Sequence, residues 1–207
     1  MKINIESKDL ERAQKVLESL GDKAKPILAK SINRALQGIP KDTSMQARKT
    51  YNVKSTQIKG SFTIERAKKN RLSGFANAKG GPISLYHFGA RPRKPGPPWP
   101  KQGVSVKVIN RKKIPGAFIG DQAAGGDPTS KLRANYAVFQ RKTGRYMRTR
   151  TGKTKHSQYI KKLHGPSVPQ MVDNKDVVDV AEEGAQERFN KTLDHEIDYT
   201  LSKLGLR

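Results

Sequence analysis

The sequence predicts an α+β protein, in which helices at both ends of the chain flank a small antiparallel or mixed β-sheet that carries long basic loops. Apolar residues recur at helical spacing near both ends, and they alternate as in strands between them. At 207 residues the chain suits one domain. We expect that domain to be helical over 1–50, β-rich with basic loops over 51–172, and closed by a long C-terminal helix over 173–204.

Two helices are expected near the amino terminus. The first runs from Lys8 to Leu20, with its apolar residues on one stripe. The second begins after Asp22, which can cap it. Gly38 and Pro40 are expected to break or bend this second helix before it continues through Ala47.

The closing helix is the longest predicted element. Asn174 or Asp173 can cap its start, and Gly205 ends it after Leu204. Its apolar residues recur every three to four positions: Val177, Val178, Ala181, Ala185, Phe189, Leu193, Ile197, Leu201 and Leu204.

The middle of the chain predicts strands. Ser61–Ala67 and Val104–Val108 alternate apolar and polar residues, as half-buried strands do. Leu72–Ala76 can pair with the first of them, and Ala117–Ile119 and Tyr136–Gln140 are shorter candidates.

Two segments of the middle predict irregular structure. Arg91–Lys101 cannot form a regular element, because its prolines lack amide donors and fix φ. Arg141–Lys162 has almost no apolar residues, so we expect a long loop or a disordered arm there. Between these features, Gly89 follows Tyr86 and Phe88, and we expect it to occupy a structural turn that needs positive φ.

The charge of the chain is concentrated in its middle. The formal net charge is +24, and residues 66–172 hold 24 basic residues against only Asp121 and Asp127. Such a block attracts polyanions by releasing their counterions, whatever the polyanion's sequence. An ordinary solvated surface, or contacts with acidic proteins, would explain the same composition.

Basic residues in three clusters are the candidate nucleic-acid-binding residues, because such side chains can follow a phosphate backbone. Tyr146 lies among them and could stack on a base. The alternative is an arm that inserts between protein neighbours. No motif for sequence-specific recognition accompanies these residues. The candidates are Arg141, Lys142, Arg145, Arg148, Arg150, Lys153 and Lys155, then Arg91, Arg93 and Lys94, and finally Arg111, Lys112 and Lys113.

The sequence offers no catalytic or cofactor-binding pattern. It has no cysteine, and its four histidines lack metal-ligand spacing. Asp121 and Asp127 lie in a glycine-rich turn, where acids more often form turns than bind metals. We therefore expect no enzyme, no cofactor and no metal. The opening residues do not resemble a secretory signal, and no run approaches the ~20 apolar residues of a membrane helix. We expect a soluble protein made in a cytoplasm, without a membrane partner.

Several segments together resemble one protein family. In chain order they are SINRAL, YNVKSTQIKGSFTIERAKK, GPISLYHFGARPRK, GVSVKVI, KIPGAFIGD, VFQRKTGR and LHGPSVPQMV. From about Ala24 to Leu204 the chain resembles the prophage minor tail protein Z family, the tail completion proteins of lambda-like siphophages.

This resemblance implies a structural component of the virion. Such a protein sits at the head-proximal end of the tail, or neck, where it helps to join head and tail and to position the DNA end. It implies tail terminator, tail tube and head connector proteins as partners, together with phage DNA, and a homo-oligomeric ring in the particle. The whole chain would then be a single tail-completion domain. The alternative is a free nucleic-acid-binding protein without sequence preference.

Overall fold

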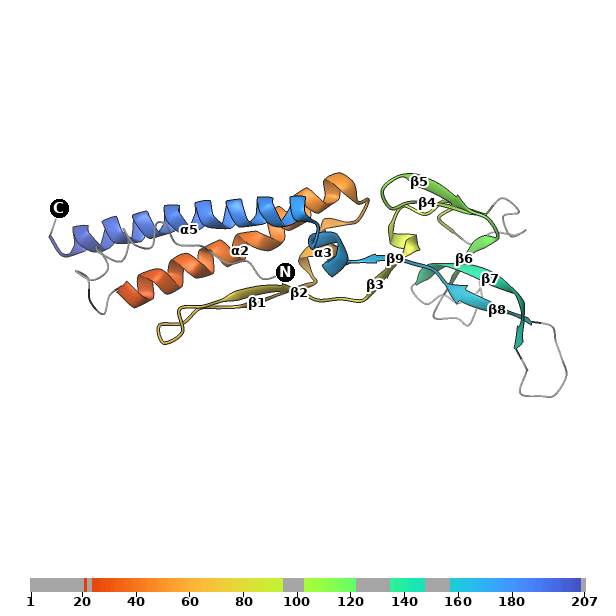
Figure 1. Cartoon of the computed structure of the whole chain (residues 1–207), viewed down its shortest axis with the longest axis horizontal. Helices are drawn as coiled ribbons and strands as arrows, with labels where there is room; N and C mark the ends of the chain where they lie inside the picture. Colours follow the sequence, from red (N-terminus) through yellow and green to blue (C-terminus); the bar gives the residue numbers. More distant parts are fainter. Residues whose placement is uncertain (1–20, 22–23, 95–102, 122–134, 148–156, 206–207) are drawn as a thin grey trace. The chain divides into compact units, whose positions relative to one another are not determined.

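The computed structural model describes residues 21, 24–94, 103–121, 135–147 and 157–205 (Figure 1). The expected helix Lys8–Leu20 lies outside these residues. The described part contains long helices, small antiparallel sheets and a long C-terminal helix, which confirms the α+β class. By contacts the chain divides into two compact units. We call residues 1–49, 55–80 and 168–207 the helical unit, and residues 50–54 and 81–167 the sheet unit.

The helical unit contains a helix that passes through the expected break. Helix α2 spans Ala24–Thr50 and includes Gly38 and Pro40. Proline removes one main-chain hydrogen bond, but packing can hold the helix across that gap. Ile39, beside the proline, is fully buried, and the Thr43 hydroxyl donates to the Ile39 carbonyl oxygen at 2.7 Å.

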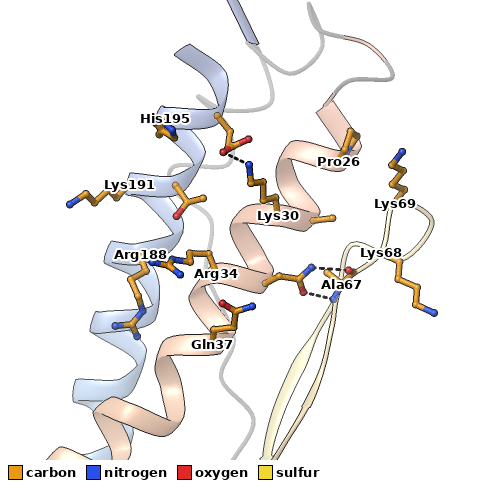
Figure 2. A pocket seen from close by; sticks show the side chains of 14 residues that line it. Pro26, Lys30, Arg34, Gln37, Ala67, Lys68, Lys69, Arg188, Lys191 and His195 are labelled. Atoms are coloured by element: carbon orange, nitrogen blue, oxygen red, sulfur yellow. Dashed lines mark hydrogen bonds and ion pairs between the residues drawn. The ribbon is translucent and has the colours of Figure 1, made fainter. Parts of the chain in front are cut away.

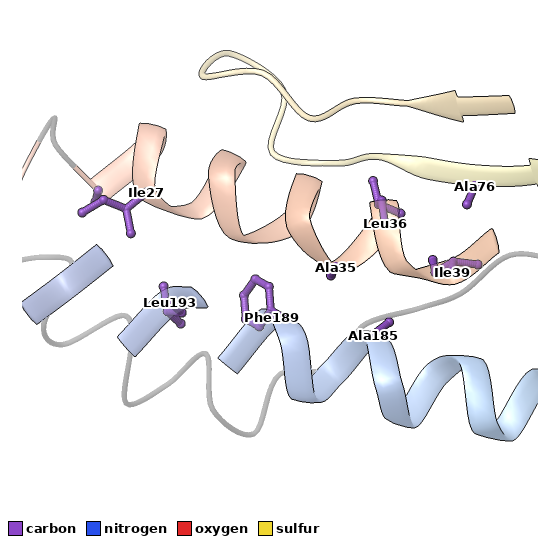
Figure 3. Close-up of a cluster of buried hydrophobic side chains, with 9 residues drawn as sticks. Ile27, Ala35, Leu36, Ile39, Ala76, Ala185, Phe189 and Leu193 are labelled. Atoms are coloured by element: carbon purple, nitrogen blue, oxygen red, sulfur yellow. The ribbon is translucent and has the colours of Figure 1, made fainter. Parts of the chain in front are cut away.

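The expected closing helix is confirmed. Helix α5 spans Lys175–Lys203, and the Asn174 side chain caps it by accepting a hydrogen bond from the Asp176 amide at 3.2 Å. Its buried side chains are five members of the predicted stripe: Val177, Ala181, Ala185, Phe189 and Leu193. Figure 3 shows how this face packs on α2, where residues such as Leu36 and Ile39 enter the same core.

A hairpin completes this core. Strand β1, Phe62–Glu65, lies within the predicted strand and pairs antiparallel with β2, Phe75–Ala78, which begins later than the expected partner Leu72–Ala76. Ala76 of β2 reaches the core formed by α2 and α5. Two five-residue helices, α3 at Ser55–Lys59 and α4 at Val168–Val172, were not predicted, because one turn is too short to show a helical period.

The sheet unit is built from small antiparallel sheets. Strand β3 (Pro82–Ser84) pairs with β9 (His164–Ser167), and β4 (Val104–Lys107) pairs with β5 (Arg111–Ile114). Strands β6 (Ala117–Asp121), β7 (Tyr136–Met147) and β8 (Ser157–Lys162) form a third sheet. A 3₁₀ turn, η2 (Leu85–His87), follows β3. The fully buried side chains of the sheet unit include Phe88, Val104, Ile119 and Val138.

The prediction of a loop or disordered arm over Arg141–Lys162 is wrong at both ends. Strand β7 continues to Met147, and β8 begins at Ser157 and pairs with it. Main-chain hydrogen bonds between strands need no apolar side chains, so a polar segment can pair when a neighbouring strand is in place. Strand β6 pairs with the first part of β7, Tyr136–Gln140, and β8 pairs with its polar continuation. Residues 148–156 lie outside the described part of the chain.

Candidate nucleic-acid interface

The turn at Gly89 leads the chain from the core to an exposed surface. Phe88 is fully buried, and Gly89 has φ +64°, a conformation that side-chain-bearing residues rarely adopt. A Cβ on Gly89 would lie 2.8 Å from Nδ2 of Asn52. The position therefore has neither the backbone conformation nor the space for a side chain.

After this turn the chain runs along β4. Arg91 and Ser105 exchange both main-chain hydrogen bonds, at 2.8 and 2.9 Å, and the Lys107 amide donates to the Phe88 carbonyl oxygen at 2.8 Å. On its other edge β4 pairs with β5, with Ser105 opposite Lys113 and Lys107 opposite Arg111. Three lengths of chain thus lie side by side.

This register places four basic side chains on one face. Paired residues share a face of a sheet, and alternate residues along a strand share it too. Arg91, Lys107, Arg111 and Lys113 therefore point to the same side, and all four are exposed. Val104 and Val106, at the intervening positions, are buried on the opposite side. We call these four residues the basic face.

Arg111 is held in place within the basic face. One terminal nitrogen of its guanidinium donates to the Gly89 carbonyl oxygen at 3.3 Å and to the Ser105 hydroxyl at 3.1 Å. In the sheet unit the described residues include a single carboxylate, that of Asp121. Little negative charge within the unit therefore offsets the positive potential of the basic face.

The other predicted binding residues are distributed differently. Lys112 lies opposite Val106, so it points away from the basic face although it is exposed. Arg93 and Lys94 are exposed just after Arg91, and the Tyr86 hydroxyl donates to the Arg93 carbonyl oxygen at 3.0 Å.

The structure describes only some of the binding residues predicted within Arg141–Lys162. Arg141 is exposed on β7, with its guanidinium carbon 5.6 Å from the centre of the Phe118 ring. Lys142 and Arg145 belong to β7, but their side chains are not described. The remaining members of this cluster lie outside the described residues: Arg148, Arg150, Lys153 and Lys155.

Lys107 belongs to the basic face, yet it was not among the predicted binding residues. Its signal was present, because the alternation that buries Val104 and Val106 places Lys107 on the exposed side. Lys107 stands alone between two valines, so it belongs to none of the runs of basic residues in the sequence.

The histidine and carboxylate side chains of the described residues offer no candidate metal site. Within these ranges, no three of them gather as metal ligands would. Burial lowers the pKa of His87, and the positive charges of Lys54 and Lys162 lower it further. None of the helices that the structure describes has the length and apolar character needed to cross a bilayer.

An exposed cationic face on a small sheet is typical of a protein that binds polyanions or acidic partners. Comparison with protein families gives a more specific result. The family model described as Prophage minor tail protein Z matches residues 7–205, nearly the whole chain. The chain belongs to this family, and its role is that of a structural protein of a phage tail, located in the virion with other tail proteins. Neither the curated proteins nor the solved structures that were compared gave a match.

Proposed function

We propose that this minor tail protein completes the tail at its head-proximal end, where it helps head–tail joining and positions the end of the phage DNA. The basic face is the observation that carries the DNA-binding part of this proposal. The protein acts by binding and not by catalysis. Its partners are the tail terminator, the tail tube and the head connector, and several copies form a ring around the DNA.

The distribution of charge between the two units supports a DNA-binding role for one of them. The sheet unit holds 20 basic and 2 acidic residues, a net charge of +18. The helical unit holds 22 basic and 16 acidic residues, a net charge of +6. Polyanion binding therefore belongs to the sheet unit, while the helical unit is close to balanced.

Only part of this charge can face DNA. Duplex DNA carries one negative charge per ~1.7 Å, so a collar ~40 Å tall encloses about 24 phosphates. A ring of several copies with +24 each exceeds that number. The remaining positive charge is available for acidic surfaces of neighbouring tail and connector proteins.

The contacts of the basic face are of the kind that ignores DNA sequence. Lysine and arginine side chains on a strand surface reach phosphates, and phosphate contacts carry no direct sequence information. Such contacts suit a protein that positions a DNA end inside a tail, because they hold the duplex whatever its base sequence.

Paired substitutions in the sheet unit test this proposal. Lys107→Gln with Lys113→Gln removes two charges of the basic face, and Lys112→Gln with Lys161→Gln removes two exposed charges elsewhere. Each phosphate contact contributes about 0.9 to the slope of log K against log salt. We expect the first pair to reduce the slope for duplex DNA by about 1.8 and the control pair to leave it near the wild-type value.

Two results would argue against the proposal. Wild-type binding that does not depend on salt would exclude phosphate contacts, and equal losses in both pairs would mean that the basic face has no special part. The alternative of a free nucleic-acid-binding protein predicts that the chain is missing from purified tails. Immunodetection in purified tails separates it from the tail role.

A further inference from the structure

A basic groove lies in the helical unit. It has a volume of about 950 Å³ and runs between α2, α5 and the segment that follows β1 (Figure 2). Six cationic side chains line it: Lys30, Arg34, Lys68, Lys69, Arg188 and Lys191. Glu196 is the one carboxylate among the described lining residues, and it pairs with Lys30 at 2.6 Å. We call this the basic groove.

The wall of the basic groove opposite α5 is fixed to α2. The Asn33 side chain donates to the Ala67 carbonyl oxygen at 3.0 Å and accepts from the Ala67 amide at 2.8 Å. Both bonds are drawn in Figure 2. Lys68 and Lys69 follow directly, and both are exposed. Their position beside the groove is therefore built into the fold.

The same helix pair carries the opposite charge farther along. Asp179, Glu183 and Glu187 are exposed on α5 at four-residue spacing, so they lie on one side of that helix. Val180 and Met45 are large apolar side chains beside them, with 39% and 59% of their surface exposed. We call the three carboxylates and these two residues the acidic patch.

We infer that the acidic patch of one copy docks in the basic groove of a second copy. The two sites match in length as well as in charge. The carboxylates span nine residues of α5, from Asp179 to Glu187, and the α5 wall of the groove also spans nine, from Arg188 to Glu196. At a rise of 1.5 Å for each of the eight steps, both stretches are about 12 Å long.

A second copy fits this groove better than DNA does. A second copy places carboxylates against the cations of the groove and in the same contact covers the exposed Val180 and Met45 of its acidic patch, whereas DNA in the groove would leave those two side chains exposed. The acidic patch and the basic groove are different surfaces of one chain. The contact between them is therefore heterologous and can repeat from copy to copy. This contact rests on the proposed function, in which several copies form a ring, and it names the surfaces through which the copies join; it does not require DNA.

Charge reversal on the full chain tests the inference. One variant carries Glu183→Lys and Glu187→Lys, and the other carries Lys68→Glu and Lys69→Glu. The experiment is sedimentation velocity at ~0.15 M salt, where the Debye length is about 8 Å. We expect the wild type to form dimers and larger species as the protein concentration rises. Each variant alone should stay monomeric. An equimolar mixture should associate again in alternating order, because the intact acidic patch of one variant meets the intact groove of the other, and the reversed patch meets the reversed groove.

For the variant with Lys68→Glu and Lys69→Glu, a control with the same change in net charge is Lys112→Glu with Lys161→Glu, which should associate like the wild type. A wild type that stays monomeric to about 100 μM, or a mixture that stays monomeric, would overturn the inference. It would also be overturned if the groove variant lost DNA binding but kept wild-type association, because the groove would then be a nucleic-acid site. Failure of the proposed DNA role is read separately, from the Lys107 and Lys113 variants.

Discussion

At the scale of single residues, Gly89 connects the core of the sheet unit to its basic face. Its left-handed backbone turns the chain after buried Phe88, and its carbonyl oxygen accepts a hydrogen bond from Arg111. The lack of a side chain leaves room for Asn52. One glycine thus sets the direction of the chain and helps to hold a cationic group of the candidate interface.

Gly89→Ala should destabilise the protein more than Gly116→Ala. Both glycines have positive φ, +64° and +67°, so both substitutions introduce backbone strain of about 1 kcal/mol. At Gly89 the new Cβ would also meet Asn52, whereas at Gly116 nothing described lies within 4 Å. We expect losses of about 2 and 1 kcal/mol in denaturant unfolding. Equal losses would show that the contact with Asn52 costs nothing.

His87 should make stability depend on pH. Its pKa is lowered from 6.5 in the folded protein, by burial first and then by Lys54 and Lys162. The unfolded chain therefore binds the proton more readily, so this contribution to stability is present above pH 6.5 and is lost as the pH falls below that value. Melting temperatures of wild type and His87→Gln at pH 7.5 and 5.5 check it. The wild type should lose more on acidification than the variant, and identical losses would contradict the assignment.

At the scale of elements, α2 and α5 approach closely around an ion pair. Arg188 of α5 pairs with Asp42 of α2 through partly buried side chains. A Cβ on Gly38 would lie 2.1 Å from the guanidinium carbon of Arg188, and one on Gly184 would lie 2.8 Å from a carboxylate oxygen of Asp42. Both helical glycines therefore provide space for this pair.

Asn33→Ala should loosen the attachment of the β1–β2 hairpin to α2. It removes both hydrogen bonds to Ala67, whose main chain belongs to a residue only 4% exposed. Each lost bond to a buried group costs about 1 kcal/mol, so we expect about 2 kcal/mol in the free energy of unfolding. Asn33→Asp keeps the acceptor for the Ala67 amide but places a carboxylate oxygen against the Ala67 carbonyl oxygen, so it should not restore the wild-type stability. A stability equal to wild type in Asn33→Ala would contradict the attachment.

Elements with a clear period were predictable from the sequence. The apolar stripe of α5 and the alternation of β1 and β4 reflect local geometry, and each appears in the structure at nearly the expected residues. The break at Gly38 was expected because a glycine and a proline together disfavour a helix. The reason for the glycine lies in Arg188, which is 150 residues away in sequence.

The candidate interface was only partly predictable, because it too depends on contacts between residues that are far apart in the sequence. Runs of basic residues identified Arg91, Arg111 and Lys113, but only strand pairing brings them together with Lys107. The same pairing separates Lys112 from its two neighbours. Register is set by contacts between distant segments, so composition alone could not distinguish these residues.

At the scale of the whole molecule, the two units differ in net charge, and we propose that they differ in function. In our proposal, the sheet unit, with 20 basic and 2 acidic residues, provides the DNA-binding surface. The helical unit, with 22 basic and 16 acidic residues, can associate with like units without strong mutual repulsion. A ring around DNA needs both properties.

A cryo-EM map of the neck of the intact particle tests the central claim most directly. We predict that the chain lies between the tail tube and the head connector, with Arg91, Lys107 and Lys113 turned toward the DNA. A chain located at the far end of the tail, or one whose basic face points away from the DNA, would contradict the account.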